Sequence, residues 1–388
     1  MIDEHTRAFI RAHKGDEVRQ LALQAARYPE VDMRVAATQI EGRRIAATKL
    51  PTWAAVEDII YPVRLSMEQC SSEATARYKA SLVEGEHLAD LTGGFGIDCS
   101  YMAERFAHTT YIERNEELCR IAAHNFALLE KPITVLNADS EEALAELTPQ
   151  DWIFIDPARR DRAGNKVVSL SDCEPDVCKL RTTLLQKATA VMVKCSPMLD
   201  IAQAVRELHT VSEIHVVSVG NECKELLLVL RGEGRADVPI HTINYQGCGV
   251  QRFDYTTEEE AAAACSYAEG VGEYLYEPNS SLMKAGCHRL PCGRFGLSKL
   301  HPNTHLYTSD AMVEDFPGRT FKVKAVYGFS KKELKALKCR QANLAVRNFP
   351  EHVDALRKRL KLSDGGELYL FATTLHDESK VLICCEKA

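Results

Sequence analysis

The sequence contains no apolar run that approaches the roughly 18 residues needed to span a bilayer. Its first residues, MIDEHTRAFIRAHKGDE, are charged and lack the apolar core of a signal peptide. These two absences argue against a membrane partner and predict a cytoplasmic location.

The 14 cysteines include no CxxC pair, and they are scattered along the chain. Several lie inside apolar or helical runs, a pattern that predicts buried reduced thiols and not a disulfide framework. Cys287, His288 and Cys292 form the only cluster that indicates a metal. A structural zinc site usually needs four ligands, and no fourth stands nearby, so we predict no metal.

The charge balance is also uneven. The chain carries 48 Lys and Arg against 55 Asp and Glu, a net charge of −7, which argues against a surface that is positive throughout. Residues 316–362 nevertheless hold thirteen basic and three acidic side chains, a local charge of +10 that leaves −17 for the remainder. One basic segment therefore stands in an otherwise acidic chain.

The 388 residues divide into four predicted regions. Residues 1–80 form a helical N-terminal region, because apolar residues recur there at spacings of three and four. Residues 81–232 alternate short apolar strands with amphipathic helices, the pattern of a parallel α/β sheet. Residues 250–316 form a small connecting domain, and residues 317–388 a basic α+β domain.

The segment LADLTGGFGID predicts a strand, a glycine-rich turn and a helix. Gly93, Gly94 and Gly96 allow the backbone to approach a ligand closely, and the free N–H groups of the helix start face that ligand. Asp90 and Thr92 lie in the same turn. A tight turn without any ligand is the alternative.

Three acidic residues follow this loop, each at the end of a predicted strand: Glu113, Asp139 and Asp156. Glu113 comes 23 residues after Asp90, where an acid accepts hydrogen bonds from ribose hydroxyls. Because open α/β sheets bind ligands at the carboxyl ends of their strands, the series predicts a nucleoside pocket.

Over residues of about 65 to 232, this series resembles the class I S-adenosylmethionine-dependent methyltransferases. The resemblance implies a Rossmann-like seven-stranded sheet, S-adenosylmethionine as cofactor, DLTGGFG as the cofactor loop, Glu113 as ribose acid, Asp139 as adenine contact and DPAR as catalytic motif. NAD binding is less consistent, because the loop lacks GxGxxG. In related enzymes the preceding segment caps the pocket, which makes Thr75, Arg77 and Lys79 candidate contacts to the methionine carboxylate; an ordinary helix surface is the alternative.

The segment Asp156-Pro157-Ala158-Arg159 stands where the methyl acceptor is expected. It is similar to the (D/N)PP(Y/F/W) motif of enzymes that methylate exocyclic amines of bases, but Arg159 replaces the stacking aromatic residue. A guanidinium can stack on a base or pair with a phosphate, and Arg160 extends this basic loop. A solvated charged turn is the alternative.

A second resemblance is to uracil-C5 RNA methyltransferases. Cys195 in VKCSP matches their nucleophile and Glu222 the spacing of their acid. This chemistry needs a thiolate that adds at C6 and a base that removes the C5 proton. Cys195 as a packing residue is the alternative.

The basic C-terminal region, over about residues 317 to 387, resembles the THUMP-like domains of bacterial proteins assigned as RNA methylases. Its candidate phosphate contacts are Lys331, Lys332, Lys335, Arg340 and Arg347. We therefore predict a methyltransferase that acts on a base in RNA. A small-molecule methyltransferase and a nucleic-acid-binding protein without catalysis remain the alternatives, and the sequence leaves the oligomeric state open.

Overall fold

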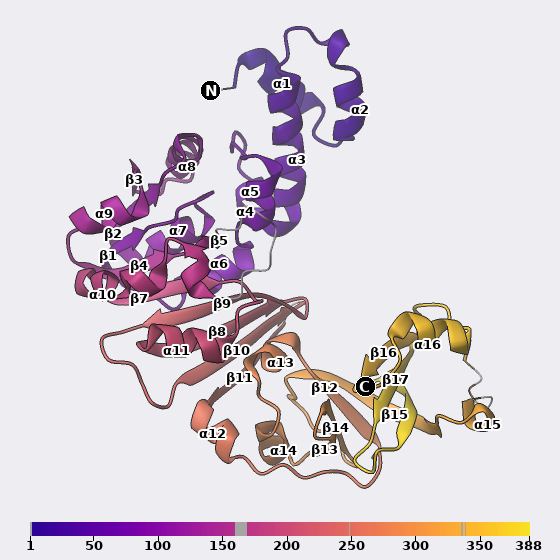
Figure 1. The fold of residues 1–388 in the computed structure, drawn as a ribbon. Coiled ribbons are helices and arrows are strands. Elements are labelled where there is room, and N and C mark those ends of the chain that lie inside the picture. Colours follow the sequence, from indigo (N-terminus) through magenta and orange to yellow (C-terminus); the bar gives the residue numbers. More distant parts are fainter. Residues whose placement is uncertain (1, 160–168, 248, 335–336, 338) are drawn as a thin grey trace. The chain divides into compact units, whose positions relative to one another are not determined.

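The computed structural model describes residues 2–159, 169–247, 249–334, 337 and 339–388. The chain forms two compact units, Met1–Ser212 with Leu227–Gly234, and Glu213–Leu226 with Arg235–Ala388 (Figure 1). Within these described ranges, no helix is both long and apolar enough to cross a membrane.

Helices account for the N-terminal region. They are α1 (Glu4–Ala12), α2 (Val18–Leu23), α3 (Met33–Lys49), α4 (Pro51–Ala54), α5 (Arg64–Gln69) and α6 (Glu73–Ala80). Asp3, Asp32 and Ser72 cap α1, α3 and α6 by accepting backbone N–H groups, which fixes the start of each. Trp53 of α4 packs edge-on against Phe95 of the glycine-rich loop, with ring centroids 5.2 Å apart. The helical region thus shares a core with the predicted cofactor loop.

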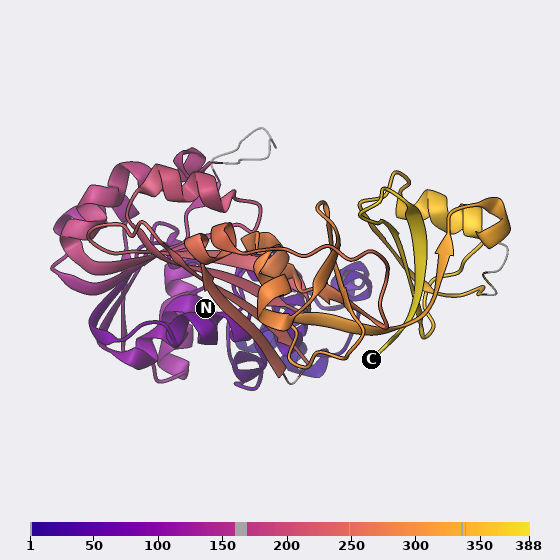
Figure 2. The same cartoon turned by 90° about the horizontal axis from the view of Figure 1, so that it is seen from below.

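Strands and helices then alternate. They are β1 (Gly85–Asp90), α7 (Ile97–Met102), β2 (Phe106–Glu113), α8 (Glu116–Leu128), β3 (Ile133–Asn137), α9 (Ser140–Glu146), β4 (Gln150–Ile155), β5 (Ala158–Arg159), β6 (Cys173–Glu174), α10 (Val177–Lys187), β7 (Ala188–Cys195) and α11 (Ile201–Leu208). The strands β3, β2, β1, β4 and β7 pair in parallel, and Figure 2 shows helices along both faces of this sheet. Both faces are covered, which explains the continuous apolar runs of β4 and β7.

Four further strands complete this sheet: β8 (Val211–Val219), β9 (Glu222–Leu230), β10 (Pro239–Gln246) and β11 (Gly249–Thr256). The full order is β11-β10-β8-β9-β7-β4-β1-β2-β3. The seven strands from β8 to β3 in that order make the predicted seven-stranded Rossmann-like sheet. The strands β10 and β11 extend it. Residues 233–249, which include β10, had no predicted element, whereas most of β11 falls in the segment predicted to begin the connecting domain 250–316.

The second unit also contains a sheet of seven strands, in the order β13-β14-β12-β15-β18-β17-β16. Its elements and those leading to it are α12 (Thr257–Ala262), β12 (Tyr274–Pro278), α13 (Ser280–Ala285), α14 (Leu290–Phe295), β13 (Ser298–His301), β14 (Thr304–Ser309), β15 (Gly318–Gly328), α15 (Lys331–Leu334), β16 (Asn343–Arg347), α16 (Val353–Leu360), β17 (Leu368–Thr374) and β18 (Lys380–Lys387). The antiparallel pairing of β12 with β15 joins the regions predicted as 250–316 and 317–388 in one sheet.

Candidate functional site

The parallel register brings the predicted acids to one edge of the sheet. Asp90 is the register partner of Phe154 on β4 and of Tyr111 on β2, so β1, β2 and β4 end together. Glu113 is the last residue of β2, and Asp156 follows the last residue of β4. Asp90, Glu113 and Asp156 therefore lie at adjoining strand ends, as the sequence predicts.

Each glycine of the loop has its own physical reason. A Cβ on Gly93 would come within 2.1 Å of the Tyr111 ring, and one on Gly96 within 2.6 Å of the Phe126 ring. Gly94 has a φ of +55°, and a Cβ there would meet only the Thr92 carbonyl at 3.8 Å. Packing thus requires two of the glycines, whereas Gly94 leaves its side of the loop open to a ligand.

Thr92 links this loop to the predicted catalytic segment at Asp156. Its hydroxyl accepts a hydrogen bond from the backbone N–H of Asp156 at 2.6 Å, and its own N–H donates to Asp90 Oδ1 at 3.0 Å. Burial raises the pKa of the Asp90 carboxyl well above its ordinary value. Asp90 is therefore a fixed part of the loop and not a solvent-facing acid.

Glu113 lies directly beside the open face of the loop. Its Oε2 accepts from the Gly94 N–H at 3.0 Å, and its Oε1 accepts from the Asn115 N–H at 2.8 Å. A carboxylate offers about four acceptor positions, so both oxygens retain capacity for two ribose hydroxyls. Asp139 is the N-cap of α9 and accepts from the Glu141 N–H at 2.8 Å, which leaves its second oxygen for a ligand.

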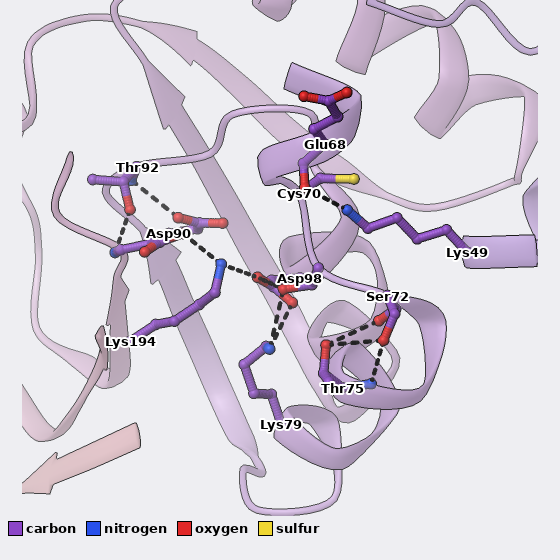
Figure 3. A network of polar contacts seen from close by, with 12 residues as sticks. Lys49, Glu68, Cys70, Ser72, Thr75, Lys79, Asp90, Thr92, Asp98 and Lys194 are labelled. Carbon is purple, nitrogen blue, oxygen red and sulfur yellow. Dashed lines mark hydrogen bonds and ion pairs between the residues drawn. The ribbon is translucent and has the colours of Figure 1, made fainter. Parts of the chain in front are cut away.

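A network of buried charges lies behind the glycine-rich loop (Figure 3). Asp98, in the first turn of α7, is 3.2 Å from Lys79 Nζ and 3.6 Å from Lys194 Nζ. Lys194, on β7, also donates to Asp156 Oδ2 at 2.5 Å. Burial alone would raise the pKa of Asp98, but the two ammonium groups bring it below its ordinary value. The network fixes the carboxylate of Asp156 from its buried side.

The structure separates the three predicted contacts on α6. Lys79 is fully buried in the charge network. The Thr75 hydroxyl instead donates to the Ser72 carbonyl at the start of the helix. Arg77 pairs with Glu73 at 2.8 Å and lies over the Tyr101 ring. Lys79 is thus the one of the three that the described contacts connect to Asp156, through Asp98 and Lys194.

Pro157 follows Asp156 and leads into β5, which pairs antiparallel with β6. The backbone of Arg159 belongs to β5, but its side chain and all of Arg160 lie outside the described residues. Asp156 itself keeps 39% of its side chain exposed. Its carboxylate is therefore paired on one side with Lys194 and accessible on the other.

Cys195 and Glu222 do not have the surroundings expected of the thiolate nucleophile and the base that C5 methylation needs. Burial raises the pKa of the Cys195 thiol well above its ordinary value, which disfavours the thiolate. Its Sγ contacts the carbonyl of Val193 on its own strand at 3.8 Å. Glu222 belongs to the second unit, where it is exposed and pairs with Lys224 at 2.7 Å.

The candidate phosphate contacts of the C-terminal region also differ among themselves. Lys332 and Arg340 are exposed. Arg347 instead pairs with the buried Glu277 at 2.6 Å, beside Arg319, so its charge is already engaged. Lys335 and the side chain of Lys331 lie outside the described residues.

Asp98 and Lys194 are functional candidates that the sequence does not single out. The signal for Lys194 was a charged residue inside the apolar run AVMVKC. Such a residue is rarely buried without a partner, and an acid two residues after Gly96 was available as that partner.

Comparisons with known proteins identify the family of the chain. Residues 274–317 match a ferredoxin-like domain family, and residues 318–387 match a THUMP domain-like family. A solved structure from Porphyromonas gingivalis W83, provisionally named a methyltransferase, is 36% identical, with 100% of both chains covered and a TM-score of 0.88. Two Mycobacterium tuberculosis proteins, from strains CDC 1551 and H37Rv, are named uncharacterized S-adenosylmethionine-dependent methyltransferases. Each is 25% identical over 314 residues, which is 80% of this chain and 83% of the relative.

The chain belongs to the class I S-adenosylmethionine-dependent methyltransferases that carry a C-terminal THUMP-like domain. It is a methyltransferase whose cofactor is S-adenosylmethionine, which confirms the predicted enzyme class, fold and cofactor. The open face at Gly94 and the spare acceptor positions of Glu113 fit the nucleoside part of this cofactor.

Proposed function

We propose that this methyltransferase modifies a base in RNA, with the acceptor bound beside Asp156. Exposed basic side chains on the THUMP-like region are the observation that carries the RNA assignment. Lys322, Lys332, Arg340, Lys358 and Lys361 are exposed. None of these five forms an ion pair with a residue that the structure describes. Unpaired ammonium and guanidinium groups on one small module suit a phosphate backbone, which they would bind without reading sequence.

The cofactor contacts follow from the loop geometry. In this proposal Glu113 accepts hydrogen bonds from the ribose hydroxyls, while Asp139 accepts one from the adenine amino group. Gly94 gives the bound molecule its closest approach to the backbone. Bound S-adenosylmethionine supplies an electrophilic methyl group.

Asp156 is the proposed catalytic residue. Its accessible oxygen accepts a hydrogen bond from an N–H of the base, which orients the nucleophilic atom. Lys194 holds the other oxygen, and Pro157 limits the backbone freedom of the turn. The buried thiol of Cys195 disfavours the alternative route through a covalent C5 adduct.

The test compares modified nucleosides in RNA from the parent organism with and without the gene, by mass spectrometry of separate tRNA and rRNA fractions. We expect one methylated nucleoside to disappear on deletion. Complementation with the wild-type gene should restore it, and complementation with Asp156→Ala should not. Identical profiles in all strains would contradict the RNA assignment, and a methylated metabolite lost in the deletion strain would establish the small-molecule alternative.

A further inference from the structure

Three potential metal ligands gather on neighbouring strands of the second unit. His215 on β8 and His241 on β10 are register partners in a parallel pair. Glu213 precedes His215 by two residues, so its side chain leaves β8 on the same face. The three residues thus share one face of two adjacent strands.

Their ligand atoms are close enough for one ion. One nitrogen of each histidine and one carboxylate oxygen of Glu213 all lie within 4.8 Å of one another. The distance from Glu213 Oε2 to His215 Nε2 is 3.6 Å. Ligand atoms bound at zinc distances in a tetrahedral arrangement are about 3.4 Å apart. The Glu213–His215 pair is therefore near its bound spacing, and His241 has about an ångström to move.

His241 carries the carboxylate partner that metal-binding histidines commonly have. Asp254 on β11 is its register partner, and its Oδ1 is 2.9 Å from His241 Nδ1. Because an ionised carboxylate can only accept, this contact makes Nδ1 the donor and leaves the Nε2 lone pair for a metal.

We propose that Glu213, His215 and His241 bind one zinc ion, with water as the fourth ligand and Asp254 orienting His241. Two imidazoles and a carboxylate form a donor set that zinc accepts. The ion links β8 to β10 where the sheet is extended beyond its seven predicted strands. Three protein ligands leave the fourth position open to water, as in zinc sites that exchange this ligand.

Accessibility supports the site. Glu213 and His241 have 30% and 31% of their side chains exposed, so an ion reaches them from solvent. His215 is buried and forms the inner side of the site. The rings stack with centroids 4.7 Å apart, so the more exposed His241 is the one that must tilt.

The chain offers a matched control. His87 on β1 and His108 on β2 are also register partners, with rings stacked at 4.9 Å and nearly parallel. This second pair belongs to no three-ligand group among the residues described. It tests whether a stacked histidine pair alone is enough.

The experiment uses the full chain without an affinity tag, stripped with a chelator, and zinc sulfate as the only added metal. Calorimetry should give one site of micromolar or tighter affinity. Glu213→Gln and His241→Ala, which remove ligands, should each weaken zinc affinity at least about tenfold. Asp254→Asn, which removes the partner of His241, should weaken it about 10–100-fold. The control His108→Ala should leave zinc affinity unchanged. Circular dichroism of the metal-free variants establishes that they fold.

Cobalt substitution distinguishes this site from the cysteines. A tetrahedral cobalt spectrum without a thiolate charge-transfer band is the expected result, because all three ligands are nitrogen or oxygen. Absence of zinc binding, unchanged affinity in His241→Ala, or a thiolate band that persists in Glu213→Gln would each overturn the proposal.

Discussion

The two units of this protein bury charge in different ways. In the first unit Asp98 is shared by Lys79 and Lys194, and all three side chains are at most 11% exposed. In the second unit the buried Glu277 is shared by Arg319 and Arg347, whose side chains are 31% and 42% exposed. The arginines can reach water if their partner is lost, whereas the lysines cannot. The first network is therefore the more sensitive to substitution.

Asp98→Asn is the change with the largest expected effect. It removes the buried carboxylate that Lys79 and Lys194 share, although Lys194 keeps its pair with Asp156, so we expect a loss of about 3–5 kcal/mol in the free energy of unfolding. Urea denaturation measures it. Glu84→Gln, which removes an exposed pair with Arg105, is the control and should cost less than about 1 kcal/mol. A loss in Asp98→Asn as small as that in the control would contradict the account.

The same substitution has a pH signature. The pKa of Asp98 is lower in the folded protein than its ordinary value of about 3.9. Its contribution to stability is therefore present above that value and is lost as the pH falls through the folded pKa. Stability measured against pH should fall less steeply in Asp98→Asn than in wild type below about pH 4.

Glu113→Ala comes next, and its effect is on binding. Loss of charge-assisted hydrogen bonds to the ribose, each contributing about 1.5–3 kcal/mol, should weaken S-adenosylmethionine binding about 10–100-fold. Calorimetry with the cofactor gives the value. Glu117→Ala on the exposed face of α8 serves as the control. Equal affinity in wild type and Glu113→Ala would rule out the ribose assignment.

Glu277→Gln tests the second network directly. We expect a loss of about 1–3 kcal/mol in the free energy of unfolding, smaller than for Asp98→Asn because both arginines gain water. Urea denaturation under the same conditions allows the two losses in unfolding free energy to be compared. A larger loss than that of Asp98→Asn would reverse the contrast between the units.

The basic residues of the THUMP-like region provide a finer contrast. Lys332, Lys358 and Lys361 are exposed without ion pairs to described residues, whereas Lys324, Arg357 and Arg359 pair with acids. Each phosphate contact to RNA contributes about 0.7 to the slope of log Kd against log salt concentration. Changing the first three residues to Ala should therefore reduce this slope by about 2. The second set should change it less. Equal effects of the two sets would show that the existing pairs do not matter.

Cys195→Ala is expected to have the smallest effect. Because burial disfavours its thiolate, methyl transfer should stay within about twofold of wild type. Incorporation of labelled methyl groups into RNA from a strain that lacks the gene measures this. A loss of more than about a hundredfold would restore the C5 mechanism.

The positions of the acids at the strand ends were predictable from the sequence, because the order of strands and helices determines how the strands pair. Alternating strands and helices require parallel pairing, and parallel pairing brings Asp90, Glu113 and Asp156 to one edge. The contacts of Lys194 were not predictable, because a strand pattern does not say which acid a buried lysine reaches.

The strand β10 was missed for a related reason. Its buried positions include Thr242 and Asn244, which read as polar loop residues in sequence. In the structure the Thr242 hydroxyl donates to the Phe253 carbonyl and the Asn244 amide to Gln251 Oε1, both at 3.0 Å. Polar side chains satisfied by a neighbouring strand do not produce the apolar alternation that identifies a strand.

Asp156, which Lys194 holds from its buried side, is the proposed catalytic residue for methyl transfer to RNA. The most direct test of this role is the single-turnover rate of Asp156→Asn at saturating S-adenosylmethionine, with RNA from a strain that lacks the gene. The account predicts a rate lower by at least about a hundredfold, with cofactor affinity close to that of wild type. A wild-type rate in Asp156→Asn would contradict it.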